Sequence, residues 1–270
     1  MSKEQVWTHF SSLAERGVWA SLYEPGTRIT AENSSFLIRA RRVMELLQAS
    51  RVKIGHLLDV GCGTAPLGPA VVAMGSRYTG IDFSRDMIES AQQIMKDSVA
   101  TGAVHLSVGD AMNLELADGS FPAVVAMGLL EYFTREQMPQ VMHEIARVLE
   151  PGGVAIITIP KKWHWQRVVN AALTPLREAV RWRPQSQLKL AKKEGFKRLY
   201  LTPGELDDAA CKQGLTKLDH RHYNVQIATG PIVSVAPRLS YVINRPFEWF
   251  ALLPGSSFFA TGYIGMYKKR

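Results

Sequence analysis

The stretch HLLDVGCGTAPLG, residues 56–68, decides the fold of this 270-residue chain. Its first five residues form an apolar run typical of a buried β-strand, and the run leads into a turn that contains Gly61 and Gly63. A strand that passes through a glycine turn into a helix builds a site where a ligand can press against the main chain. The stretch therefore predicts a site for a nucleotide phosphate, a dinucleotide or another cofactor that carries a nucleoside.

The residues after Gly63 narrow this choice of ligand. A phosphate-binding loop needs Lys followed by Ser or Thr after its glycines, and the stretch contains no such pair. The dinucleotide fingerprint needs another glycine three places after Gly63, where this chain has Pro66. A pyrophosphate is therefore not the ligand that this turn favours.

Strand-like runs recur along the chain with helical patterns between them. Ser84 can cap one helix, and Thr202–Glu205 has the pattern of a capping box at the start of another. A further helix has apolar residues from 141 to 149 and is expected to stop at Pro151. Strands that alternate with helices imply crossover connections and a mostly parallel, doubly wound α/β sheet. The strand-like runs lie at residues 56–60, 77–82, 104–110, 123–128, 153–160, 216–225 and 260–269.

Three aspartates stand at the ends of the first three strand-like runs. Asp59 precedes the turn, Asp82 ends the second run about 20 residues past the glycines, and Asp110 ends the third. Parallel strands end at one edge of a sheet, so these carboxylates are expected to line one crevice. Asp82 has the position from which a carboxylate can accept both hydroxyls of a ribose. Each aspartate alone could be a strand-end cap, but together they predict a site for a positively charged nucleoside.

Five segments, in order, resemble the motifs of class I S-adenosylmethionine-dependent methyltransferases: LLDVGCGTAPLG, YTGIDFSRDMI, VGDAMNL, VVAMGLLEYF and IARVLEPGGVAIITIP. The likeness covers residues 50–160 and is greatest to the branch that includes quinone-biosynthesis and small-molecule enzymes. It implies S-adenosyl-L-methionine as cofactor and S-adenosyl-L-homocysteine as its product. It assigns the methionine end to Asp59, Gly61 and Gly63 with Cys62 between them, the ribose to Asp82, the adenine to Phe83, Met87, Asp110 and Ala111, and the methylthio centre to Met127 and Gly128.

The turn also contains Cys62 and Ala65. Cys62 is expected to be a small packing residue and not a nucleophile, because no histidine or second cysteine is near it in the sequence. Ala65 stands where members of the family usually have glycine. A negative φ at Ala65 would make this departure harmless, whereas a positive φ predicts weaker cofactor binding.

Four residues near the expected crevice are candidates for catalysis. Glu131 and Tyr132 follow the fourth strand, His164 follows the fifth, and His222 lies near the end of the sixth. His164, His222 or Tyr132 could take a proton from a hydroxyl or an activated carbon, whereas an amine acceptor needs no such base. The alternative for each histidine is a surface or core role, and for Glu131 the start of a loop. The Asn/Asp-Pro-Pro-aromatic signature of base-amino and amide methyltransferases is absent from the sequence after the fourth strand, which disfavours DNA adenine and glutamine as acceptors.

The net charge of +8 is concentrated in one segment. Residues 161–198 carry eleven Lys or Arg and two Glu, and the pattern from Trp165 to Val180 predicts an amphipathic helix kinked at Pro175. This helix could be a lid over an apolar substrate, contact an anionic membrane, or simply pack on the core with its charges solvated. The segment lacks the aromatic platform of single-strand binders, so nucleic acid is not the expected partner.

We expect one domain built on a Rossmann-like, seven-stranded sheet. Its parts are an N-terminal helical cap (1–50), a cofactor-binding half (51–160), a basic insertion after the fifth strand (161–199) and a C-terminal half that shapes the substrate pocket (200–270). Two widely spaced cysteines and the absence of a signal-peptide pattern favour the cytoplasm, with peripheral membrane contact if the insertion provides it. The sequence contains no cluster of metal ligands, so no metal is expected.

The sequence thus predicts an enzyme that moves a methyl group from S-adenosylmethionine, by in-line displacement, to a small molecule. The basic insertion and the apolar stretch at 227–253 favour an apolar or amphipathic acceptor such as a lipid or quinone, with O- or C-methylation favoured over N-methylation. Two other functions stay open: an RNA methyltransferase that uses the basic insertion, and a non-catalytic partner subunit that binds the cofactor.

Overall fold

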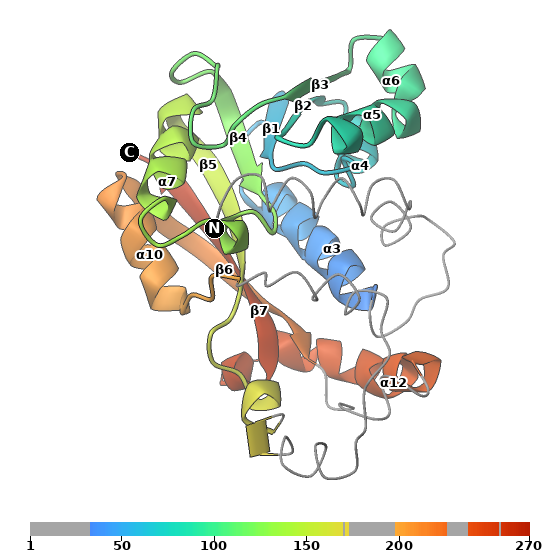
Figure 1. The fold of residues 1–270 in the computed structure, drawn as a ribbon, viewed down its shortest axis with the longest axis vertical. Helices are drawn as coiled ribbons and strands as arrows, with labels where there is room; N and C mark the ends of the chain where they lie inside the picture. The colour runs from blue at the N-terminus through green and yellow to red at the C-terminus, as the bar shows by residue number, and fades with distance from the viewer. Residues whose placement is uncertain (1–32, 170, 173–197, 226–236, 254) are drawn as a thin grey trace.

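The computed structural model describes residues 33–169, 171–172, 198–225, 237–253 and 255–270. Its centre is a seven-stranded sheet in the order β3-β2-β1-β4-β5-β7-β6, in which β7 is antiparallel to both neighbours and the other pairs are parallel (Figure 1). The predicted α/β, doubly wound and mostly parallel sheet is therefore confirmed. The strands are β1 (His56–Val60), β2 (Arg77–Asp82), β3 (Val104–Val108), β4 (Phe121–Ala126), β5 (Leu149–Pro160), β6 (Leu215–Val225) and β7 (Ala260–Lys269).

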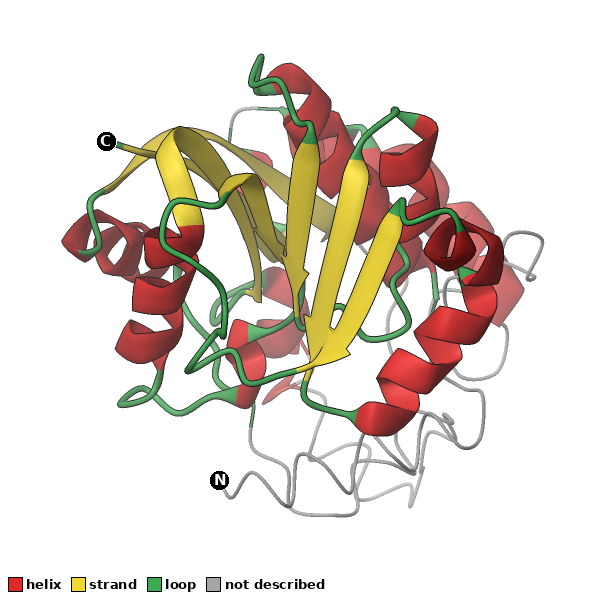
Figure 2. Ribbon diagram, turned by 90° about the horizontal axis from the view of Figure 1, so that it is seen from above, coloured by secondary structure: helices red, strands yellow, loops and turns green. Residues whose placement is uncertain are grey.

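Helices cover both faces of the sheet (Figure 2). Side chains of α3, α4 and α5 form one buried cluster with Leu57, and side chains of α7 and α10 form another with Leu58. Adjacent residues of β1 supply the two clusters because successive side chains of a strand point to opposite faces. The helices are α3 (Ser34–Ala49), α4 (Gly68–Ala73), α5 (Arg85–Ile94), α6 (Lys96–Ala100), α7 (Met138–Val148) and α10 (Pro203–Lys212).

The two predicted helix caps are present. The Ser84 hydroxyl accepts a hydrogen bond of 3.4 Å from the backbone N–H of Met87 at the start of α5. At the start of α10, Thr202 accepts from the N–H of Glu205, and the Glu205 carboxylate accepts from the N–H of Thr202. Each cap satisfies backbone donors that the first turn of a helix leaves unpaired.

Several strand boundaries differ from the prediction: β3 ends at Val108 and not at residue 110, β4 begins at Phe121 and not at residue 123, β5 begins at Leu149 and not at residue 153, and β6 begins at Leu215 and not at residue 216. Two further differences have a local reason. Helix α7 ends at Val148 and not at Pro151, because Leu149 already pairs with Phe121 across an irregular register between β5 and β4. Strand β4 ends at Ala126 and not at residue 128, because Gly128 has a φ of 71° that a strand does not adopt.

The chain between β6 and β7 contains the helix α12 (Pro237–Asn244) and three short 3₁₀ turns, η3 (Arg245–Glu248), η4 (Phe250–Leu252) and η5 (Ser256–Phe258). Residues 165–169 and 171–172 are helical, in agreement with the start of the predicted amphipathic helix. Most of that helix, Pro175 and Val180 included, lies outside the described residues, as do residues 1–32 of the expected cap. In the described ranges no helix has the length and apolar character needed to cross a bilayer.

Candidate functional site

The turn after β1 brings the main chain against two neighbouring segments. The N–H groups of Gly61 and Cys62 both donate to the carbonyl of Ile81 in β2, at 2.7 and 3.1 Å. Gly61 has a φ of 74°, and a Cβ built on it would lie 2.6 Å from Cδ1 of Leu129, which follows β4. A side chain at this position would force Leu129 to move and would strain the backbone, so both φ and packing favour glycine here.

Asp59 and Asp82 are both buried beside this turn. Tyr78 donates its hydroxyl to Oδ2 of Asp59 at 2.8 Å, and the N–H of Gly63 donates to Oδ2 of Asp82 at 2.8 Å. Burial raises the pKa of Asp59 to about 7, and the nearby Asp82 adds to this rise. Burial also raises the pKa of Asp82, although the N–H groups of Ser84 and Gly63 oppose that change.

The other oxygen of Asp59 carries the strongest sign of a ligand. Oδ1 of Asp59 is buried and has no hydrogen-bond partner within the described ranges of the chain. A buried carboxylate oxygen without a partner costs free energy unless a donor or a cation reaches it. This oxygen is therefore a suitable binding position for a positively charged or hydrogen-bond-donating group, such as the amino group of a methionine moiety.

Cys62 behaves as the expected packing residue. Its thiol is buried and lies 3.6 Å from the carbonyl oxygen of Gly63. Burial, with the two nearby aspartates, raises the pKa of the Cys62 thiol well above its ordinary value. The thiolate that a nucleophile would need is thus disfavoured.

The residues that the resemblance assigns to the adenine lie at the same sheet edge. Met87 and Ala111 are buried, whereas Phe83 and Asp110 are partly exposed. Asp110 lies beyond the end of β3 and accepts a hydrogen bond of 3.0 Å from the N–H of Met112 through Oδ1. The three aspartates thus lie at the carboxyl ends of three adjacent strands, as the sequence predicted.

The end of β4 approaches α3 at Gly128, next to the buried Met127. The N–H of Gly128 donates to the hydroxyl of Thr158 at 2.8 Å. A Cβ on Gly128 would lie 2.6 Å from Nη1 of Arg39. Gly128 therefore lets the main chain pass directly beside a buried guanidinium.

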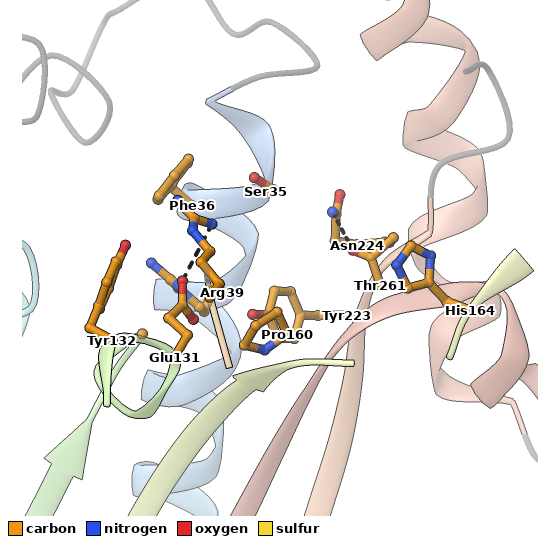
Figure 3. Close-up of a pocket in the computed structure, with 12 residues that line it drawn as sticks. Ser35, Phe36, Arg39, Glu131, Tyr132, Pro160, His164, Tyr223, Asn224 and Thr261 are labelled. Carbon is orange, nitrogen blue, oxygen red and sulfur yellow. Dashed lines mark hydrogen bonds and ion pairs between the residues drawn. The ribbon is translucent and has the colours of Figure 1, made fainter. Parts of the chain in front are cut away.

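A pocket of about 200 Å³ opens beyond Gly128 (Figure 3). It is enclosed by α3, the segment after β4, the end of β5, Arg198 and the facing ends of β6 and β7. Figure 3 shows Glu131 and Tyr132 on one side of this space and His164 with Thr261 on the other. Three of the four predicted catalytic candidates thus line one pocket.

One wall of the pocket is an ion pair. Nη1 of Arg198 lies 3.5 Å from Oε1 of Glu131, whose side chain is buried. The guanidinium of Arg198 also lies over the ring of Tyr132, at 5.7 Å from its centre. The N–H of Leu199 donates to the carbonyl of Glu131 at 2.9 Å, so the chain that leads into α10 is tied to the segment after β4.

The two candidate histidines differ in position. His164 lines the pocket, and its Nδ1 is buried without a hydrogen-bond partner in the described residues. Burial, assisted by Arg167 and Lys161, lowers the pKa of His164 to about 4, so its ring is neutral at pH 7.

His222 instead packs its ring against His220 and Tyr263, at 5.5 and 5.4 Å between ring centres. Burial lowers the pKa of His222 to about 4 as well. Among the described residues, the next two of β6, Tyr223 and Asn224, line the pocket, whereas His222 does not.

Residues that the sequence reasoning missed complete the pocket, among them Arg39, Arg198, Asn224 and Thr261. Asn224 donates its side-chain amide to the hydroxyl of Thr261 at 2.6 Å, which joins the ends of β6 and β7. The sequence did contain a signal for Arg39. It lies four residues before Val43, a spacing that puts both residues on the buried face of α3, where an arginine is unexpected.

Comparison with known proteins agrees with this geometry. A family model described as a methyltransferase domain matches residues 57–153. Norajmaline N-methyltransferase of Rauvolfia serpentina is 30% identical over 175 residues, which are 57% of this chain and 58% of that enzyme. The chain therefore spans less than two thirds of the length of that relative.

Two further proteins cover more of the chain. A demethylmenaquinone methyltransferase of Staphylococcus haemolyticus is 29% identical over 225 residues, 75% of this chain and 86% of that enzyme. The crystal structure of magnesium protoporphyrin IX methyltransferase from Synechocystis PCC 6803, with bound SAH, covers 100% of both chains with a TM-score of 0.66 and 14% identity, which shows a shared fold. Residues 57–153, which contain the glycine turn and the ends of β1, β2 and β4, therefore match a methyltransferase domain.

Proposed function

We propose that this chain is an S-adenosylmethionine-dependent methyltransferase that acts on a small, apolar or amphipathic metabolite by O- or C-methylation. The observation that carries this proposal is the buried Oδ1 of Asp59, without a partner in the described residues, beside a glycine turn that a Cβ would fill. A cationic amino group fits this oxygen, and the flat main chain of the turn fits a ligand pressed against it.

The residues of the turn and of the strand ends would hold the cofactor in sequence along the sheet edge. Asp59 and the turn would take the methionine end. The two oxygens of Asp82, each held by a backbone N–H, would accept hydrogen bonds from the ribose hydroxyls. Met127 and Gly128 would border the reacting centre, and Phe83, Met87, Asp110 and Ala111 would enclose the adenine.

When bound, the cofactor supplies an electrophilic methyl carbon on its sulfonium. The task of the protein is then to align a nucleophile with that carbon and to keep water out. The pocket beyond Gly128 adjoins the expected position of this carbon and has room for an acceptor.

His164 is our candidate for the residue that takes a proton from a hydroxyl or carbon acceptor. Its ring is neutral at pH 7, and its buried Nδ1 lacks a partner in the described chain, so it can accept a hydrogen bond. Glu131 holds Arg198 against Tyr132 and so positions that wall of the pocket. His222, outside the described lining, is the weaker candidate.

The lining of the pocket and the relatives support the proposed class of acceptor. The pocket presents the rings of Phe36, Tyr132 and Tyr223 together with Pro160, which suits an apolar or amphipathic molecule. Two of the relatives are named for the methylation of norajmaline and of demethylmenaquinone. A cytoplasmic location belongs to this proposal, and the free thiols of Cys62 and Cys211 are in keeping with it.

Titration calorimetry tests the cofactor part of the proposal. We expect heat on addition of S-adenosylmethionine and S-adenosylhomocysteine, none with NAD, and a loss of affinity of about 100-fold or more in Asp82→Ala. Asp97→Ala, which removes an exposed aspartate from α6, is the matched control and should bind as the wild type does. Equal affinity in Asp82→Ala would contradict the proposal.

A labelling experiment tests the acceptor part. The protein is incubated with methyl-labelled cofactor and a cell extract, which is then separated into lipid, small polar and RNA fractions. Label in the lipid or apolar fraction supports the proposal. Label in RNA, with an affinity that falls steeply with salt, supports the RNA methyltransferase instead, and cofactor binding with no labelled product supports a non-catalytic partner subunit.

A further inference from the structure

Exposed apolar side chains gather at one end of the molecule. Of the fourteen large hydrophobic side chains that are exposed among the described residues, ten lie at 163–168 or 239–259. Figure 1 shows α12 and the helical turn at 165–172 together at this end, opposite α5 and α6. Soluble proteins rarely leave a contiguous apolar surface uncovered unless it binds something. We call the surface formed by residues 163–168 and 239–259 the aromatic face.

The aromatic face is a connected surface. Ring centres lie 5.9 Å apart for Trp249 and Phe250, 6.1 Å for Phe250 and Phe259, and 5.7 Å for Phe258 and Phe259. Trp165 joins the same group from the other segment, at 6.4 Å from Phe259. These rings therefore bridge two parts of the chain that are almost a hundred residues apart.

Helix α12 adds an aliphatic stripe to this surface. Leu239, Val242 and Ile243 are all exposed, and their spacing of three and four residues puts them on one side of the helix. Val242 is 62% exposed and Trp249 of the following turn is 58% exposed. A helix with an outward apolar stripe is typical of an element that lies in a membrane interface.

The charges of the aromatic face are of one sign. Arg167, Arg238 and Arg245 are exposed, and Lys162 lies 5.9 Å from the ring centre of Trp163. The acid in the described parts of these segments, Glu248, is buried and accepts hydrogen bonds from backbone N–H groups of β6. The described surface thus presents cations and apolar rings without an exposed carboxylate.

We propose that the aromatic face docks this protein on an anionic lipid bilayer. Tryptophan and phenylalanine rings lie well at the boundary of headgroups and acyl chains, and arginines beside them bind lipid phosphates. A nucleic acid would match the cations but not the exposed aliphatic stripe. The combination of apolar area and uniform positive charge is complementary to an anionic bilayer.

The docking surface adjoins the acceptor pocket. His164, which lines the pocket, lies between Trp163 and Trp165 of the aromatic face. An amphipathic acceptor could therefore pass from the bilayer into the pocket without crossing water. This last step rests on the proposed function, whereas the docking itself does not.

Sedimentation with vesicles tests the proposal. We expect the full-length protein to bind phosphatidylcholine vesicles that contain phosphatidylglycerol, and to bind pure phosphatidylcholine vesicles more weakly. The double variant Trp249→Ser, Phe258→Ser should lose about tenfold in partitioning, since 1.4 kcal/mol of lost burial corresponds to that factor. The double variant Arg238→Gln, Arg245→Gln should lose the preference for anionic vesicles and keep the weaker binding.

A matched control comes from the opposite end of the molecule. Met74 and Ile94 are 41% and 53% exposed but lie directly after α4 and at the end of α5, so Met74→Ser, Ile94→Ser should partition as the wild type does. The proposal is overturned if the wild type stays in the supernatant, if both serine variants behave alike, or if the apolar surface proves to be covered by a second copy in a dimer that ignores vesicles.

Calorimetry with S-adenosylmethionine on the same samples separates this proposal from the proposed function. Every surface variant should retain the cofactor affinity of the wild type. Vesicle binding without methyl transfer would support the docking surface and contradict the proposed function. Methyl transfer without vesicle binding would support the proposed function and contradict the docking surface.

Discussion

The turn after β1 relies on main-chain groups and buried carboxylates that belong to neighbouring strands, whereas the pocket beyond β4 is enclosed by side chains from distant segments. Gly61 and Asp82 lie within the matched domain at 57–153, but Arg39 and Thr261 lie outside it, on opposite sides in the sequence. A local backbone shape can bind one cofactor in many proteins, while the pocket can change with each loop that reaches it. Under the proposed function, we therefore expect the first region to bind the cofactor and the second to select the acceptor.

The largest expected effect separates the two regions at His164. We expect His164→Gln to lower kcat about 100-fold for a hydroxyl acceptor, because proton transfer to a positioned base contributes a factor of that size. Cofactor affinity should stay unchanged, since His164 lines the pocket and not the turn. The wild-type kcat should show no titration of this ring near neutral pH, because its pKa is lowered to about 4.

The control for this prediction is His143→Gln, which changes an exposed histidine on α7. It should leave kcat and cofactor affinity as they are. A fall in cofactor affinity in His164→Gln, or equal losses in both variants, would show that the two regions are not separable in this way.

The same contrast explains what the sequence could predict. The bounds of β1, β2 and β7 were predicted as observed, because period, glycines and strand-end acids are local signals. The pocket was not predictable in this way: whether His222 or its neighbour Tyr223 points into it depends on which face of the sheet the pocket adjoins. Arg198 lies at the pocket wall in contact with Glu131 and Tyr132, which come from another segment of the chain.

The boundary between the regions is tested at Gly128. We expect Gly128→Ala to reduce activity about tenfold, because its Cβ would displace the guanidinium of Arg39 from the pocket wall. Gly75→Ala is the matched control, since Gly75 has a similar φ of 77° with no atom within 4 Å of the added Cβ. Both variants should lose about 1 kcal/mol of stability through backbone strain, and only Gly128→Ala should lose activity. Parallel losses of activity would assign the effect to strain alone.

Asp59→Asn tests the charge of the cofactor region through pH. The pKa of Asp59 is raised from 3.8 to about 7, so the folded protein holds this proton more tightly than the unfolded chain does. The stability that this proton provides is fully present below pH 3.8 and is lost as the pH rises toward 7. Between about pH 5 and about pH 8 in urea unfolding, the wild type should therefore lose about 2–3 kcal/mol of stability relative to the variant. The affinity of the variant for S-adenosylmethionine should be several-fold weaker at the upper end of this range, where the wild-type carboxylate is ionised. A wild-type affinity that did not depend on pH would contradict the assignment of Oδ1 to a cationic group.

The smallest expected effect lies at Ala65, whose φ of 56° is the case for which the sequence predicted weaker cofactor binding. The N–H of Ala65 donates to the carbonyl of Cys62 at 2.9 Å, and its own carbonyl accepts from Gly68 at 3.0 Å. These two hydrogen bonds keep φ positive without a ligand. The backbone strain therefore lowers the stability of the fold and does not lower the affinity for the cofactor. Ala65→Gly relieves about 1–2 kcal/mol of strain but loses a buried methyl worth about 0.8 kcal/mol and adds about 0.4–1 kcal/mol of chain entropy. We expect a change in stability below about 1 kcal/mol and an unchanged affinity for S-adenosylmethionine, and a tenfold gain in that affinity would instead assign the strain to the bound state.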